Sequence, residues 1–281
     1  MYDLNHLAKH LRSASLKKKD ATFIHLHEDD QLISFEDFFQ NAEKIASALI
    51  SAGIRPGDRV AMQVEKSSSA IELYFGTILA GAGFLPLNTA YVAEEIDFFL
   101  RDARPSIFVC DPSKLNNYTK IAESSGVSHI WTLSAEGTGS LIDAKNSESP
   151  GFTGVKRNPD DLAAVLYTSG TTGHSKGAML THRNLQSNAK ALVKCWQFTD
   201  EDILIHALPL YHTHGLFVAT NVSLLAGSSM LLMKKFDADA ICRRMPQASV
   251  LMGVPTFYVR LLEHPDLENA AKKIRLFVSG S

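Results

Sequence analysis

The sequence of 281 residues contains few cysteines, and the three that it has are far apart. Cys110, Cys195 and Cys242 show neither a CxxC spacing nor a Cys/His pattern of the kind that binds zinc. Their spacing argues against a disulfide framework and against a structural zinc site. We therefore expect a protein of a reducing cellular interior.

Long hydrophobic runs are also missing. No segment approaches the roughly 20 apolar residues that cross a bilayer, and residues 1–19 lack the apolar stretch of a signal peptide. The formal net charge is −2 and the sequence has no long basic run, so composition gives no reason to expect nucleic acid or a membrane as a partner. These absences together predict a cytoplasmic protein. A mitochondrial transit peptide is the alternative that stays open, although His6, Asp3 and the Lys-rich turn at residues 17–19 make a poor one.

The composition is that of an ordinary globular protein, 45% hydrophobic and 21% charged, and helix and strand patterns alternate along it. Helices are predicted over residues 35–49, 69–79, 93–103, 114–124, 182–196, 214–225, 238–245 and 256–263. Strands are predicted over residues 59–64, 84–87, 106–110, 127–131, 161–167, 202–208, 228–233, 249–254 and 274–280. This alternation predicts an α/β fold of layered sheets and helices.

Residues 143–160 form the longest stretch without periodicity. They are predicted to be a surface connection between a first α/β subdomain over residues 1–142 and a second over residues 161–281. The second subdomain ends on a buried-strand pattern, Ile274 to Val278, with no helix after it, although parallel sheets normally have both faces covered. We therefore expect the second subdomain to be incomplete and the chain to be an N-terminal piece of a longer protein.

The most informative segment is Tyr167 to Gly177, with the sequence YTSGTTGHSKG. Its glycines let backbone N–H groups approach an anion closely, and its Thr and Ser hydroxyls add further hydrogen-bond donors. Lys176 adds a mobile positive charge. This composition predicts a loop that binds phosphate groups.

Two other interpretations of this loop are disfavoured. In a Walker loop the fifth residue after Gly170 would be glycine and a hydroxyl would follow the lysine, but the sequence has Ser175 and Gly177 at these positions. A flexible linker would have low hydrophobicity on both sides, whereas this loop lies between a buried-strand pattern and an amphipathic helix pattern. The sequence therefore favours a phosphate-binding loop over a Walker loop and over a flexible linker.

The loop and four other stretches together resemble the adenylate-forming superfamily of acyl-CoA synthetases, luciferases and peptide-synthetase adenylation domains. The four stretches, in order, are GIRPGDRVAM (53–62), AGAGFLPLNTAY (80–91), HALPLYHTHGL (206–216) and VLMGVPTFYVRLL (250–262). Within the superfamily they look most like the malonyl-CoA synthetases. The resemblance covers residues 34–281 and implies the N-terminal domain of these enzymes, with the C-terminal domain absent.

The resemblance implies a two-step reaction with ATP, Mg²⁺ and coenzyme A, in which the last is a co-substrate. A carboxylate of the acid attacks the α-phosphate of ATP and releases pyrophosphate, and the thiol of coenzyme A then displaces AMP to give a thioester. The substrate would be malonate or methylmalonate. On this reading the β- and γ-phosphates contact Thr168, Ser169, Gly170, Thr171, Thr172, Gly173 and Lys176.

His212 occupies the position of the superfamily's histidine, near the acyl pocket and the α-phosphate, and with Lys176 it is a predicted catalytic residue. A purely structural histidine at a helix start is the alternative. His214, two residues further on, is a candidate to bind substrate beside it.

Arg260 is the predicted contact for the second carboxylate of malonate, because a buried carboxylate needs a partner and Arg forms a bidentate, charge-assisted one. It follows Thr256 by four residues on a predicted helix, so the two share a face. A solvated Arg on an amphipathic helix is the alternative. The predicted pocket wall consists of Gly253, Val254, Pro255 and Thr256. Ser279 and Gly280 are predicted to begin the turn beside the adenine and acyl sites, and a simple strand ending is the alternative for them.

The superfamily's motifs for adenine, ribose and the mobile C-terminal domain are not found in the sequence. We therefore expect this chain alone to bind ATP weakly and to turn over little. Two alternatives stay open: a non-catalytic nucleotide- or acyl-binding module, and a synthetase for another short carboxylic acid. The predicted ligands are small molecules in each case, and the oligomeric state is not indicated.

Overall fold

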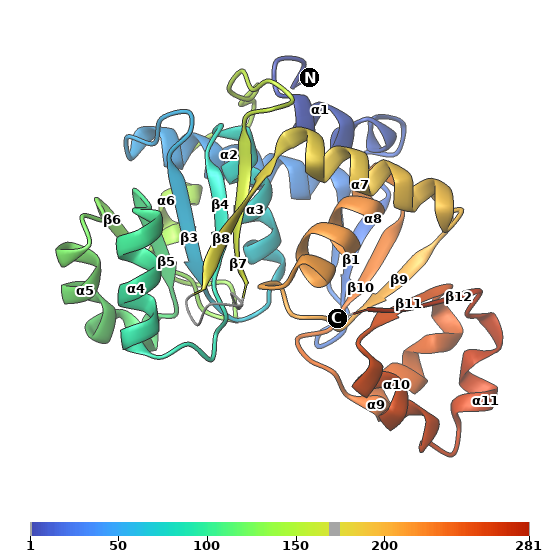
Figure 1. The fold of residues 1–281 in the computed structure, drawn as a ribbon. Helices are drawn as coiled ribbons and strands as arrows, with labels where there is room; N and C mark the ends of the chain where they lie inside the picture. The colour runs from blue at the N-terminus through green and yellow to red at the C-terminus, as the bar shows by residue number, and fades with distance from the viewer. Residues whose placement is uncertain (1, 169–174, 281) are drawn as a thin grey trace. The chain divides into compact units, whose positions relative to one another are not determined.

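The computed structural model describes residues 2–168 and 175–280 (Figure 1). The chain divides into two compact units. Unit 1 comprises Met1–His10 and Phe39–Gln186, and unit 2 comprises Leu11–Phe38 and Ser187–Ser281. No helix in the described ranges is both long enough and apolar enough to cross a membrane.

A six-stranded sheet forms the centre of unit 1 (Figure 1). Its strands, in spatial order, are β6 (His129–Thr132), β5 (Ile107–Cys110), β3 (Arg59–Gln63), β4 (Gly83–Pro86), β7 (Leu162–Thr168) and β8 (Lys176–Thr181). The first five are parallel, and β8 runs antiparallel to β7. The helices of this unit are α3 (Ser68–Leu79), α4 (Ala93–Ala103), η2 (Pro112–Lys114), α5 (Leu115–Ser124) and α6 (Ser140–Asn146).

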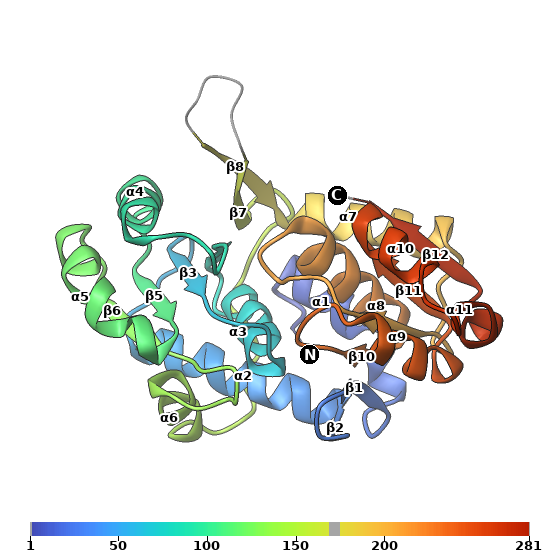
Figure 2. The same ribbon diagram turned by 90° about the horizontal axis from the view of Figure 1, so that it is seen from below.

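Helices α4 and α5 lie side by side and cover one face of this sheet (Figure 2). Their buried side chains, among them Phe99 and Tyr118, pack on Phe108 of β5. Helix α3 is buried along most of its length and packs closely on α2 (Phe35–Ser51). A Cβ added at Gly76 of α3 would lie 2.8 Å from Cγ2 of Ile45, so the close approach requires glycine.

A second six-stranded sheet forms the centre of unit 2. Its strands, in spatial order, are β12 (Leu276–Ser279), β11 (Val250–Gly253), β9 (Ile203–His206), β10 (Ser229–Leu232), β1 (Thr22–Leu26) and β2 (Leu32–Ser34). All neighbours are parallel except β1 and β2. The helices of this unit are η1 (Ala14–Lys17), the π-helix η3 (His214–Thr220), α8 (Asn221–Ala226), α9 (Ala238–Arg244), η4 (Met245–Gln247), α10 (Pro255–Leu262), α11 (Leu267–Ala270) and η5 (Ala271–Lys273).

The two compact units do not coincide with the two expected subdomains. Segment 143–160 lies within unit 1, and helices α1 (His6–Arg12), α2 and α7 (His182–Cys195) cross the division. The reason is long-range pairing, because β1 lies beside β10, about 200 residues further along the chain, with Ile24 opposite Met230. Hydrophobic periodicity reports local structure and carries no signal for such a pairing.

The predicted alternation of helices and strands is confirmed, with small shifts at the ends. The capping box that begins α2 is present: Asp37 N–H donates to Ser34 Oγ at 3.0 Å, and Ser34 N–H donates to Asp37 Oδ2 at 3.3 Å. Three predictions needed correction. The segment after the phosphate-type loop contains strand β8, the first part of the helix predicted over residues 214–225 is the π-helix η3, and α6 occupies the start of the predicted connection.

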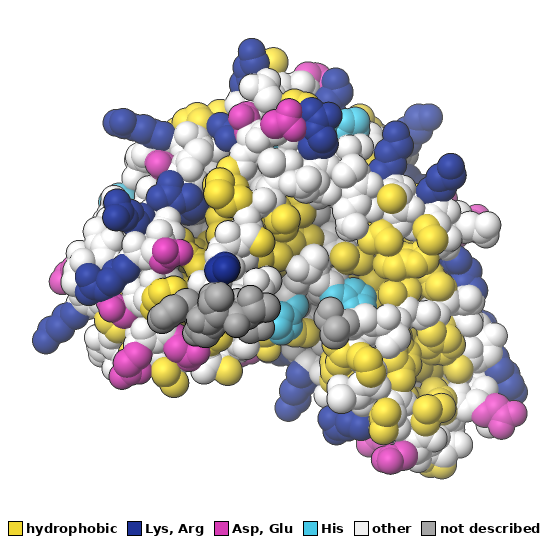
Figure 3. All heavy atoms as spheres, in the orientation of Figure 1, with side chains coloured by type: hydrophobic (Ala, Val, Ile, Leu, Met, Phe, Trp, Pro, Cys, Tyr) yellow, Lys and Arg dark blue, Asp and Glu magenta, His cyan; other side chains and the backbone are white. Residues whose placement is uncertain are grey.

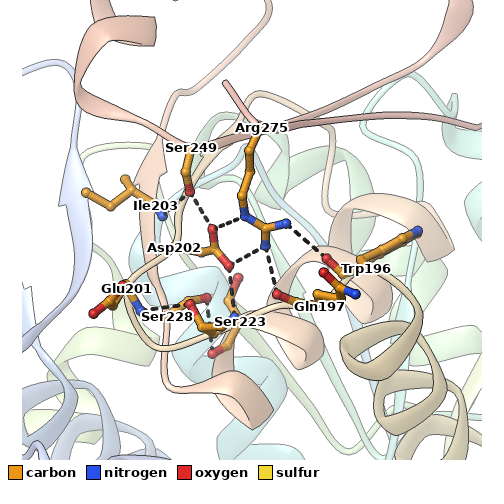
Figure 4. A network of polar contacts seen from close by, with 10 residues as sticks. Trp196, Gln197, Glu201, Asp202, Ile203, Ser223, Ser228, Ser249 and Arg275 are labelled. Atoms are coloured by element: carbon orange, nitrogen blue, oxygen red, sulfur yellow. Dashed lines mark hydrogen bonds and ion pairs between the residues drawn. The ribbon is translucent and has the colours of Figure 1, made fainter. Parts of the chain in front are cut away.

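A buried carboxylate links three segments of unit 2 (Figure 4). Asp202 accepts hydrogen bonds from Arg275 at 2.8 and 2.5 Å, from Ser249 Oγ at 2.7 Å and from Thr199 N–H at 2.9 Å. The same guanidinium donates to the carbonyls of Trp196 and Gln197 just after α7. Burial raises the pKa of Asp202, but these hydrogen bonds, chiefly from Arg275, outweigh burial and hold it below its ordinary value.

Replacing Asp202 by Asn is expected to lower the free energy of unfolding by about 2 kcal/mol at neutral pH, because a charge-assisted bidentate contact is lost. A carboxylate with a lowered pKa stabilises the fold above its unfolded-state pKa, and the stabilisation disappears as pH falls through the folded-state value. The difference between the two proteins should therefore shrink below about pH 4. Urea unfolding at several pH values measures it.

Asp200→Asn is the matched control, since Asp200 forms an exposed ion pair with Lys18 in the same unit. This change should leave the unfolding midpoint almost unchanged. Equal effects of the two substitutions would show that the Asp202 network contributes no special stability.

Candidate functional site

The described ends of the predicted phosphate loop lie on two paired strands of unit 1. Thr168 ends β7 and Lys176 begins β8, and the two residues are directly opposite in the antiparallel ladder. Both side chains are exposed. The hairpin therefore places a hydroxyl and an ammonium group beside each other where the loop begins and ends. The other predicted phosphate contacts, Ser169, Gly170, Thr171, Thr172 and Gly173, lie outside the described residues.

Several predicted site residues meet at one edge of the sheet in unit 2. Because β9, β11 and β12 are parallel, their carboxyl ends share that edge, which is where ligands bind in open α/β sheets. Gly253 at the end of β11 pairs with Ser279 at the end of β12. Gly280 N–H donates to Gly253 O at 3.1 Å, and the Gly280 carbonyl lies 3.2 Å from His214 Nδ1.

The contact with Gly280 fixes the proton on the His214 ring. A carbonyl oxygen only accepts, so Nδ1 carries the proton and donates it. Burial lowers the pKa of His214, and the Gly280 carbonyl opposes this shift only in part, so the ring is neutral at pH 7. Nε2 is buried and has no hydrogen-bond partner among the described residues. In this geometry His214 joins the π-helix to the end of β12.

A second histidine holds the first turn of the π-helix η3. His206 at the end of β9 donates through Nε2 to the Gly215 carbonyl at 2.8 Å, and the ring is completely buried. Gly215 lies against the backbone of the preceding loop, where an added Cβ would meet the Pro209 carbonyl oxygen at 1.9 Å. Single π-helical turns are rare and occur often at functional sites. Sequence patterns did not single out His206 or Gly215, because neither shows a local signal for this packing.

His212 lies two residues before the π-helix and is exposed. Its ring packs edge-on against Tyr211, with 4.7 Å between the ring centroids. Partial desolvation lowers the pKa of His212, so its imidazole is neutral at pH 7 and has one N–H donor. Because the His212 side chain is exposed, a ligand can reach it, whereas Nε2 of His214 is buried.

The predicted pocket wall continues from β11 into α10. Val254 caps the helix in an extended conformation, and Pro255 at its first position has the backbone angle that a helix start requires. Thr256 and Arg260 are both exposed on α10. The guanidinium carbon of Arg260 lies 4.8 Å from the ring centroid of Phe236. Stacking occupies the face of the guanidinium and leaves its in-plane N–H donors able to bind a carboxylate.

A groove of about 570 Å³ lies elsewhere in unit 2. It is lined mainly by apolar residues: Tyr258, Leu261, Leu262, His264, Pro265, Leu267, Glu268, Ala271 and Phe277. Hydrophobic side chains gather on the surface over α10 and α11 (Figure 3), where Leu262 is 75% and Val259 59% exposed. None of the predicted site residues lines this groove.

The described residues contain no cluster of three or more His, Cys, Asp or Glu side chains that could hold a metal ion. Their donors suit a polyphosphate better, since Lys176 and Thr168 project from adjoining strands. Magnesium ions commonly bind with few protein ligands and through substrate phosphates. A Mg²⁺ ion bound chiefly through the phosphates of a substrate would need no such cluster.

The chain belongs to the family of AMP-binding enzymes, whose model matches residues 11–281. It is similar to ATP-bound MatB from Rhodopseudomonas palustris, with a TM-score of 0.95 and 49% identity over 99% of this chain and 55% of that one. The match confirms the α/β fold and the resemblance found in the sequence.

Two curated relatives are named after different acids. A malonate–CoA ligase of Arabidopsis thaliana is 30% identical over 251 residues, which are 82% of this chain and 41% of the relative. A feruloyl-CoA synthase of Amycolatopsis sp is 32% identical over 249 residues, which are 85% of this chain and 47% of the relative. The chain thus spans about half the length of the proteins that it matches, and identity to curated relatives does not by itself select an acid.

Replacing Gly215 by Ala is expected to cost about 3 kcal/mol of unfolding free energy, because the new methyl group displaces either the π-helix or the Pro209 carbonyl. Chemical unfolding and near-ultraviolet circular dichroism measure the effect. Gly126→Ala is the control: an added Cβ there meets nothing within 4 Å, but φ is +78°, so only about 1 kcal/mol of backbone strain is expected. A cost at Gly215 no larger than at Gly126 would contradict the close packing.

Proposed function

We propose that this chain is the nucleotide-binding part of an acid–thiol ligase that activates malonate or a closely related small dicarboxylate. The observation that carries the proposal is the β7–β8 pair, which presents Thr168 and Lys176 at the two ends of a glycine- and hydroxyl-rich segment. Membership in the AMP-binding family and the similarity to an ATP-bound protein support the same nucleotide.

In the first step an oxygen of the acid attacks the α-phosphorus of ATP, the bond to the bridging oxygen breaks, and pyrophosphate leaves with the electron pair. Reactions of this type depend on positioning and on charge stabilisation more than on a protein nucleophile. Lys176 and the hydroxyl and backbone donors of residues 168–173 would hold the β- and γ-phosphates. Mg²⁺, when bound, neutralises phosphate charge.

In the second step the thiol of coenzyme A attacks the acyl carbon, AMP leaves, and the thiol proton is released. His212 is the proposed donor toward the α-phosphate and the acid, because its ring is neutral, exposed and next to the π-helix. The residues proposed to line the acyl and adenine sites lie at or just after the carboxyl ends of β11 and β12: Gly253, Val254, Thr256, Ser279 and Gly280. For His214 we propose a supporting contact, because its Nε2 is covered.

The proposed acid rests on Arg260 and on the relatives named as malonate–CoA ligases. An acid with two carboxylates has one left over after it reacts, and this second charge needs a cationic partner. Arg260 is exposed, and its in-plane donors suit that role. An uncharged acyl tail would not need such a partner.

Lys176→Gln is expected to weaken MgATP binding about tenfold, because one charge contact with phosphate, worth about 1.4 kcal/mol, is lost. Equilibrium dialysis with labelled ATP measures the dissociation constant. Lys120→Gln, on the exposed side of α5 in the same unit, is the control and should bind like the unchanged chain. Absence of ATP binding by the unchanged chain would contradict the proposed function.

ATP–pyrophosphate exchange separates the proposal from its alternatives. Any exchange that the chain supports is expected to depend on malonate rather than acetate. ATP binding with neither exchange nor malonate binding would favour a non-catalytic nucleotide-binding module. Equal exchange with acetate would favour a synthetase for another short acid.

Arg260→Gln is expected to weaken malonate binding in the presence of ATP by about 10- to 100-fold, because a charge-assisted contact of about 1.5–3 kcal/mol is lost. Arg260→Lys keeps the charge but not the fork of donors and should have an intermediate effect. Isothermal titration calorimetry with malonate and with ATP measures the two dissociation constants of each variant. If ATP affinity fell as much as malonate affinity, Arg260 would not be the specificity contact.

A further inference from the structure

One described residue beside the predicted phosphate loop, Tyr167, has a side chain that the proposed chemistry does not use. The hydroxyl of Tyr167, near the end of β7, donates to the carboxylate of Asp102 on α4. The ring centroid of Tyr167 lies 4.6 Å from that of Phe99 and 6.3 Å from that of Phe98. The end of β7 is therefore attached to α4 by both an aromatic contact and a hydrogen bond.

Strand β8 lies close to the ring of Tyr167. Gly177 of β8 is the ladder partner of Tyr167. A Cβ added at Gly177 would lie 3.1 Å from Val165 Cγ1 and 3.4 Å from Tyr167 Cζ. An added Cβ would therefore be crowded by Val165 and would touch the phenol ring, so glycine lets β8 lie close to β7 at this pair. The next ladder pair outward is Thr168 and Lys176.

The packing around Tyr167 and Gly177 supports the next two residues, which are proposed to contact phosphate. Thr168 and Lys176 are exposed and have no packing of their own comparable to that of Tyr167. The separation and direction of these two side chains therefore depend on the neighbouring ladder pair, Tyr167 and Gly177. Burial and the neighbouring Asp102 both raise the pKa of the Tyr167 hydroxyl, so it stays protonated and remains a donor at neutral pH. A binding group must be held within about half an ångström of its productive position, which requires such support.

We propose that Tyr167, through its hydrogen bond to Asp102, is a positioning residue for the polyphosphate of the nucleotide. The proposal rests on the proposed function, because it assigns Tyr167 a role in nucleotide binding. It differs from a purely structural role in that removal of one hydroxyl changes nucleotide affinity more than it changes the stability of the unit.

The test compares Tyr167→Phe, Asp102→Ala and the double substitution in the 281-residue chain. The phenylalanine variant keeps the ring and its contacts with Phe98 and Phe99 and removes only the hydroxyl. Each single variant is expected to weaken MgATP binding about fivefold in equilibrium dialysis. The double variant should bind no more weakly than either single one, since both remove the same contact. The urea unfolding midpoints should stay close to that of the unchanged chain.

Two further measurements separate positioning from general damage. Tyr118→Phe, which removes another partly buried hydroxyl in unit 1, should leave ATP affinity unchanged. Amide hydrogen exchange at Lys176 and Gly177 should be faster in Tyr167→Phe, and exchange in the central strand β3 should not change.

The two proposals fail in different ways. If the unchanged chain does not bind MgATP, the proposed function is wrong. If the unchanged chain binds MgATP but Tyr167→Phe and Asp102→Ala bind it equally well, the positioning role is wrong and the proposed function stands. Additive effects in the double variant would also overturn the proposal, because they would show that the two groups act separately.

Discussion

The parallel pairing of β9, β11 and β12 is the constraint on which the candidate site of unit 2 depends. Parallel strands bring their carboxyl ends to one edge, so the residues that follow each strand become neighbours whatever their distance in sequence. His206, Gly253 and Ser279 end these three strands. The π-helix is joined to the same edge twice, by His206 to Gly215 and by His214 to Gly280. The sheet thus fixes the position of the loop between β9 and the π-helix, which contains His212.

In unit 1 an antiparallel pair of strands, β7 and β8, lies at the edge of a parallel sheet. The antiparallel ladder between β7 and β8 sets Thr168 and Lys176 opposite each other. The aromatic contacts of Tyr167 with α4 connect this pair to the core of the unit.

Much of this fold follows from hydrophobic periodicity. The helices predicted over residues 35–49 and 69–79 from local patterns are present as α2 and α3. Strand β8 was missed because four of its six residues are exposed and none is fully buried, so it shows no core pattern. The pairing of β1 with β10 was missed because it joins distant segments. For the site, motifs identified His214 and Gly280 separately, but only coordinates show that they touch.

Strand β12 forms the outer margin of its sheet among the described strands, and Phe277 on it is 45% exposed beside the apolar groove of α10 and α11. An open strand margin with an apolar neighbour is a template for backbone pairing with any extended polypeptide. Strand β12 is therefore a place in unit 2 where an added strand, from this or another polypeptide, would extend the sheet.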